Sequence, residues 1–166
     1  EWGILYNTSE NTSLSSNRYP SQKWFEYNIE KIRKMADETG VHLALHVCGK
    51  ETQNLMNGSS LFLNQLIEYF DRVQINFHYK NSYKENLLAL FEDYDDIVFI
   101  TQNNKANQKI LEDIPAVKNH QILFDNSGGR GITQANWLVP IENKICGYAG
   151  GLGPQNIEQE LLKIDK

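Results

Sequence analysis

VHLALHVC, residues 41–48, is the stretch that decides the fold class. Successive side chains of a strand point to opposite faces, so the leucines and the second valine share one face, while His46 and Cys48 share the other. One face is therefore apolar, and the other becomes polar toward the carboxyl end. A strand covered by helices on both sides of an open sheet is apolar on both faces. The pattern instead favours a strand of a barrel. The inner face of such a strand becomes polar at the mouth, the opening of the barrel at the carboxyl ends of its strands.

Two later stretches have the same alternation. In RVQINFH, residues 72–78, the polar face carries Gln74, Asn76 and His78. In QILFD, residues 121–125, Leu123 and Asp125 oppose the isoleucine and the phenylalanine. Each segment therefore predicts a strand with one apolar face and one face that becomes polar toward the carboxyl end of the strand.

Apolar, β-rich runs recur along the chain, and from the third run on they begin about every 24 residues. Amphipathic segments separate most of them, which predicts alternating strands and helices in a parallel sheet. A helix is predicted from the N-cap Ser21 to Gly40, and another begins at Pro154 as its first residue. Residues 132–143 give only a weak helix signal. The six runs are residues 3–6, 41–48, 72–78, 96–102, 121–125 and 144–150.

We predict one domain over residues 1–166, an incomplete TIM (β/α)8 barrel of the ribulose-phosphate-binding type with about six βα units. The chain opens inside a strand-like segment and ends inside a helix-like one, so we expect a fragment of a longer barrel. The alternative is an open doubly wound sheet, which six units also satisfy.

Charge and composition exclude several classes of function. The chain has 16 Lys and Arg against 21 Asp and Glu, a net charge of −5, which argues against a nucleic-acid partner. It has no apolar run long enough to cross a membrane, and we expect no signal peptide. Cys48 and Cys146 form no C-x-x-C pattern, so we expect no disulfide framework and a cytoplasmic location.

Polar residues stand at the carboxyl ends of the predicted strands, and a barrel would gather them around one mouth. Each alone can be structural, but together they are costly to bury without a ligand. Only two of the histidines and one carboxylate could bind a metal, from non-adjacent strands, so we predict neither a metal nor a cofactor. The set is His46, Cys48, Asn76, His78, Gln102 and Asp125.

Asp125 is the leading candidate for catalysis. A partly desolvated carboxyl group can have a raised pKa and act as a general acid. Alternatively, it caps backbone N–H groups of the turn at 127–131. The base is either Cys48 as a thiolate, with its pKa lowered by His46, or His46 itself.

Two glycine-rich turns predict a site for an anion. Glycine lets the backbone approach a ligand closely, and the second turn precedes a helix N-terminus, where phosphate binds well. The alternative is that the glycines only form tight turns. Arg18, after a polar stretch that resembles a lid, and Arg130 can each meet a second anion or remain solvated. The glycines are Gly128, Gly129 and Gly131 in the first turn, and Gly150, Gly151 and Gly153 in the second.

Three segments resemble phosphoribosylanthranilate isomerase, the small barrel enzyme of tryptophan synthesis. RVQINFH (72–78) is similar to that family's fourth strand, LFDNSGGRGI (123–132) to its sixth strand and glycine turn, and GYAGGLGPQNI (147–157) to its seventh strand. The resemblance covers residues 70 to 160 well, and it implies that the visible strands are the second to seventh of the barrel.

The resemblance implies roles for several residues. Asp125 falls on the family's general acid, and Gly150, Gly151 and Asn156 fall on its phosphate loop. Arg18 corresponds loosely to an arginine that meets the substrate carboxylate. The substrate class implied is a small phosphorylated sugar, rearranged by Amadori-type isomerisation. A phosphometabolite-binding barrel without chemistry is the alternative.

The chain also departs from the family pattern. The family's catalytic cysteine belongs to the first strand, which this chain lacks, and HVCGK (46–50) occupies the third strand by position. Cys48 therefore does not inherit that role. The turn after Asp125 also lacks the family's threonine, so a paralogue with another substrate fits the sequence as well.

Overall fold

The computed structural model describes residues 1–8, 19–114, 117–127 and 130–164. It is an α/β fold with one sheet of six parallel strands. The strands are β1 (Trp2–Tyr6), β2 (Leu43–Cys48), β3 (Arg72–Asn76), β4 (Val98–Asn103), β5 (His120–Phe124) and β6 (Cys146–Tyr148). The helices are α1 (Gln22–Thr39), α2 (Glu51–Met56), α3 (Leu61–Ile67), α4 (Lys84–Asp93), α5 (Ile110–Asp113) and α6 (Ile157–Ile164), with a 3-10 turn at Asn81–Tyr83.

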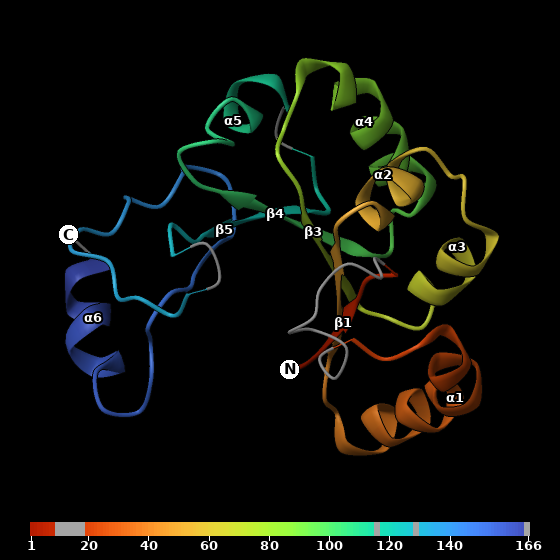
Figure 1. Cartoon of the computed structure of the whole chain (residues 1–166). Coiled ribbons are helices and arrows are strands. Elements are labelled where there is room, and N and C mark those ends of the chain that lie inside the picture. The colour runs from red at the N-terminus through yellow and green to blue at the C-terminus, as the bar shows by residue number, and fades with distance from the viewer. Residues whose placement is uncertain (9–18, 115–116, 128–129, 165–166) are drawn as a thin grey trace.

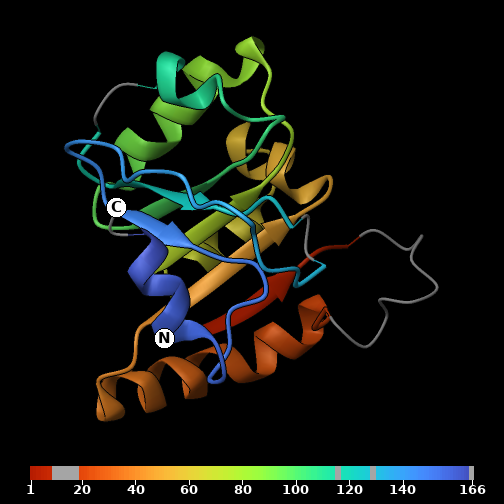
Figure 2. The same ribbon diagram turned by 90° about the vertical axis from the view of Figure 1, so that its left-hand side faces the viewer.

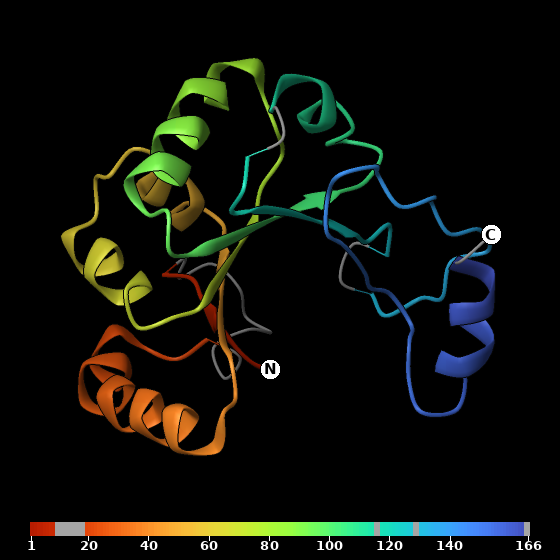
Figure 3. The ribbon, with the colours of Figure 1, turned by 180° about the vertical axis from the view of Figure 1, so that it is seen from behind.

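The order of strands in the sheet follows their order in the chain, from β1 to β6. A doubly wound sheet reverses its strand order at a switch point, and the described strands have no such reversal. Because parallel crossovers are right-handed, sequential strands carry their helices on one side. Figure 1 shows α1 to α5 in an arc around one side of a curved sheet, and Figure 3 shows the same arc from behind.

The side of the sheet that faces the helices contains the core. Val73 and Ile75 of β3 have no exposed surface, whereas Gln74 and Asn76, on the other face, are half-buried. This is the alternation that the sequence predicts. The polar face therefore lies on the inner side of the curve, and all six strands end at the same edge (Figure 2).

The first helix begins and ends where the sequence predicts. The hydroxyl of Ser21 accepts a hydrogen bond from the backbone of Trp24, and Gly40 closes the helix with φ of 67°, in the left-handed region. Within the described residues, none of the helices combines the length and the apolarity needed to span a bilayer.

The sequence missed one short helix, and one predicted helix start needs correction. The missed helix is α2, which Gly58 separates from α3. The last helix starts at Ile157, because Pro154 belongs to the turn that precedes it. Residues 132–143 contain no helix.

Candidate functional site

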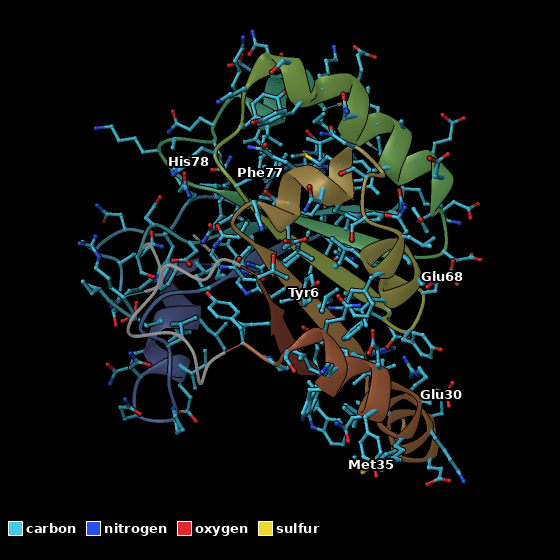
Figure 4. The ribbon with its side chains drawn as sticks, turned by 45° about the vertical axis from the view of Figure 1, so that its right-hand side comes forward. Tyr6, Glu30, Met35, Glu68, Phe77 and His78 are labelled. Atoms are coloured by element: carbon cyan, nitrogen blue, oxygen red, sulfur yellow. The ribbon has the colours of Figure 1, made fainter. Side chains whose placement is uncertain are left out.

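The six polar residues predicted at the mouth line one cavity of about 450 Å3 at the carboxyl ends of the strands. Parallel strands end at one edge, so side chains from β2, β3 and β4 and the residues that follow β3 and β5 meet there. Figure 4 shows Phe77 and His78 beside each other at this edge. Four further residues complete the lining: Leu5, Tyr19, Phe77 and Asn104.

Asp125 accepts hydrogen bonds on both of its carboxylate oxygens. Oδ1 accepts from the backbone N–H of Ser127 at 2.8 Å and from the Ser127 hydroxyl at 2.6 Å. Oδ2 accepts from Nε2 of Gln102 at 2.8 Å. The capping role proposed as the alternative is therefore present, and the side chain also lines the cavity.

The thiol of Cys48 lies beside an amide donor. Nδ2 of Asn76 is 3.9 Å from Sγ, and the Cys48 side chain is only 8% exposed. His46 has its Nε2 atom 3.2 Å from Nε2 of Gln74. Because an amide nitrogen only donates, this contact makes the histidine nitrogen the acceptor, which places its ring proton on Nδ1. His46 and Cys48 both belong to β2 and line the same cavity.

A second hollow of about 710 Å3 adjoins the first, and the two share His78, Asn104 and Asp125. It adds the ammonium group of Lys105 and the amide of Asn103. Asn103 is 2% exposed, and its Nδ2 atom has no hydrogen-bond partner among the described residues. Sequence reasoning missed both residues, although they lie one and three residues after Gln102, whose strand-end position was the available signal.

Asn107 holds the loops of the cavity together from beneath. Its Nδ2 atom donates to the carbonyl oxygens of Phe77 at 2.8 Å and Gln102 at 3.0 Å, and its Oδ1 accepts from the backbone of Tyr79 at 2.9 Å. It is 1% exposed. The loop after β3, which carries His78, is thus fixed to the end of β4.

The second glycine turn packs against the protein's own backbone. A Cβ atom on Gly151 would lie 2.2 Å from the backbone nitrogen of Thr133, and one on Gly150 would lie 3.1 Å from the carbonyl oxygen of Ile132. Asn156 donates to the Gly151 carbonyl at 2.8 Å and accepts from the Gly153 N–H at 2.8 Å. The close approach made by these glycines is therefore between two loops, and their contact with an anion stays a prediction.

The other residues predicted to contact an anion include Gly131 and Arg130 of the first glycine turn. Gly131 is exposed, with φ of 65° and open space where a side chain would stand. Nε of Arg130 donates to the Ser127 carbonyl at 3.0 Å, which ties the guanidinium to the turn below Asp125. Gly128, Gly129 and Arg18 lie outside the described residues.

The described residues contain no group of three histidine, cysteine or acidic side chains that could hold a metal ion. No protein-family model, no curated protein and no solved structure matches this chain.

Proposed function

We propose that this protein is an enzyme similar to phosphoribosylanthranilate isomerase, acting on a phosphorylated sugar by acid/base proton transfer within an incomplete (β/α)8 barrel. The observation that carries the proposal is the convergence of Asp125, Cys48 and His46 on one cavity at the strand ends. Active sites of parallel barrels lie at this edge. The sequential strand order and the helices on one side also support a barrel over a doubly wound sheet.

In the proposed reaction, protonated Asp125 gives its proton to the ring oxygen of an N-glycoside. The bond between that oxygen and C1 breaks, its electron pair goes to the oxygen, and an iminium forms at C1. A base then removes the proton from C2, and the electrons of the C–H bond form the enolamine, which tautomerises to the ketone.

Cys48 and His46 are the candidates for the base. The Nδ2 atom of Asn76 lies 3.9 Å from Sγ of Cys48 and can donate a hydrogen bond to that sulfur. His46 has its Nε2 atom as the acceptor facing Gln74. Neither residue lies at the position of the catalytic cysteine in the phosphoribosylanthranilate isomerase family.

A binding barrel without chemistry is the second candidate. It is favoured by the side chains of Asp125 and Asn156, which both form hydrogen bonds with backbone groups of their own turns. Residues with such structural roles would be needed whether or not a reaction takes place.

The replacement Asp125→Asn separates the two candidates, with phosphoribosylanthranilate as the first substrate to test. General acid catalysis contributes about 10²–10⁴ in rate, so kcat should fall at least about a hundredfold while substrate binding persists. The exposed Asp95→Asn is the matched control and should change neither quantity.

Melting temperature and kcat should be measured on the same preparations. A folded Asp125→Asn protein that turns over normally would exclude the acid role. If the wild-type chain binds the substrate without turnover, the binding barrel is the better description.

A further inference from the structure

A groove of about 650 Å3 runs between α1 and α3, on the helical side of the sheet and away from the candidate site. Its floor is apolar. Phe25, Ile29 and Leu66 are buried there, and Phe62 is half-buried. We call this feature the α1–α3 groove. Such an apolar concavity suits apolar side chains of another molecule.

The rim of the groove is acidic. Glu26 and Glu30 come from α1 and Glu68 directly follows α3, and all three are exposed. Figure 4 shows Glu30 and Glu68 on the same side of the molecule. Among the described residues that line the groove, none is basic, and neither Glu30 nor Glu68 forms an ion pair within the described part of the chain.

The nearest arginine does not neutralise this rim. Arg33, one turn further along α1, holds Asp37 at 2.6 Å and Asp71 at 2.9 Å. Its guanidinium also donates to the carbonyl oxygen of Tyr69, which lines the groove. The positive charge is thus already paired with two carboxylates, and the negative charge of the rim remains available to a partner.

We infer that the α1–α3 groove docks a basic amphipathic helix of a partner protein, with apolar side chains on the floor and Lys or Arg side chains at the glutamates. This is the helix-in-groove mode, with charge complementarity added at the rim. A second copy of this chain fits less well, since it has a net charge of −5 and would bring like charges together. The inference is independent of the proposed function.

The test uses fluorescence anisotropy of labelled model peptides with the full chain. The probe is a Leu/Lys peptide of about sixteen residues with leucines on one helical face, because shorter helices are marginal in water. A Leu/Glu peptide of the same pattern tests the charge, and a Ser/Lys peptide tests the apolar floor. Only the Leu/Lys peptide should bind in a saturable manner, and added salt should weaken it.

Two double variants locate the binding. Glu30→Gln combined with Glu68→Gln removes two charges from the rim and should raise Kd about three- to tenfold. Glu38→Gln combined with Glu92→Gln removes the same charge from exposed positions outside the groove, and it should leave Kd unchanged. Circular dichroism should show all of these proteins folded.

Three results would overturn the inference. One is the absence of saturable binding of the Leu/Lys peptide to the folded protein. Another is an equal loss of affinity in both double variants, which would assign the attraction to net charge alone. The third is equal binding of the Ser/Lys peptide, which would remove any role for the floor.

Discussion

The Nζ atom of Lys144 lies 3.1 Å from Nδ1 of His120, and this contact fixes the tautomer of a buried histidine. An ammonium group only donates, so Nδ1 accepts and the ring proton is on Nε2. Nε2 lies 2.7 Å from the hydroxyl of Thr101, to which it donates. The neutral ring also stacks on Phe91, with centroids 5.0 Å apart.

The first prediction is that the free energy of unfolding falls as pH falls from about 6.5 to 3. Burial, and then the charge of Lys144, lowers the pKa of His120 from 6.5 to about 3. In this window the unfolded chain binds a proton that the folded protein does not, so acid favours unfolding. At 1.36 kcal/mol per pKa unit, His120 should account for roughly 3 kcal/mol between pH 6.5 and pH 4. Urea unfolding at several pH values measures the slope.

The control separates His120 from the other titrating groups. His120→Leu should lower stability at pH 7, because it leaves Thr101 and Lys144 without their ring partner, but its pH slope should be flatter. Lys118→Gln, at an exposed position two residues before His120, should keep the wild-type slope. Equal slopes in all three proteins would contradict the prediction.

The second prediction is that any side chain at Gly151 destabilises the fold. Gly151→Ala would place a Cβ atom 2.2 Å from Thr133 N at a φ of 64°. Gly131→Ala is a matched control, since Gly131 has nearly the same φ of 65° but nothing within 4 Å of an added Cβ. The control should cost about 1–2 kcal/mol of unfolding free energy from backbone strain alone.

The difference between the two variants then measures the packing of the glycine turn against the loop before it. Overpacking typically adds about 1–3 kcal/mol. Thermal and urea unfolding give both values. If Gly151→Ala is no less stable than Gly131→Ala, the two loops do not pack in solution as they do in the structure.

The strands could be predicted from the sequence because their signals are local. The alternation of Val73 and Ile75 with Gln74 and Asn76 indicates both the strand and its buried face. Because parallel strands end at one edge, the same reasoning gathers His46, Asn76 and Asp125 around one cavity.

The roles of the glycines could not be predicted, because they depend on contacts between segments distant in sequence. Nothing near Gly151 in the chain indicates that Thr133 lies against it. The same holds for Asn107, whose neighbours in sequence give no sign that its amide joins two strand ends. The short helix α2 was missed because its 6 residues, fewer than two turns, give little periodicity.

The third prediction concerns the buried amide of Asn107. Asn107→Ala removes three hydrogen bonds, each of which contributes about 0.5–1.5 kcal/mol net, so the free energy of unfolding should fall by about 2–4 kcal/mol. Asn107→Asp should be at least as harmful, because it directs a carboxylate oxygen at two carbonyl oxygens. Asn86→Ala, which removes more exposed hydrogen bonds on α4, should cost less than about 1 kcal/mol. An Asn107→Asp protein of wild-type stability would contradict the role assigned to this amide.

The fourth prediction is that the chain associates through the edges of its sheet. Within the described part of the chain, β1 pairs with no strand but β2 and β6 with no strand but β5, so both are edge strands of the sheet. Exposed strand edges act as templates for pairing with another chain. Sedimentation velocity should therefore show a weight-average mass that rises with protein concentration.

Gly3→Lys tests whether β1 is responsible for this association. Gly3 is the second residue of β1, and an added Cβ would meet nothing within 4 Å, so lysine fits there without a clash. Charged side chains, lysine above all, discourage pairing at strand edges, so the variant should shift the protein toward monomer. Ser82→Lys adds the same charge at an exposed site outside the sheet and should associate like the wild type. A wild-type chain that remains monomeric at all concentrations and unfolds in one cooperative transition would show that these edges are protected in solution.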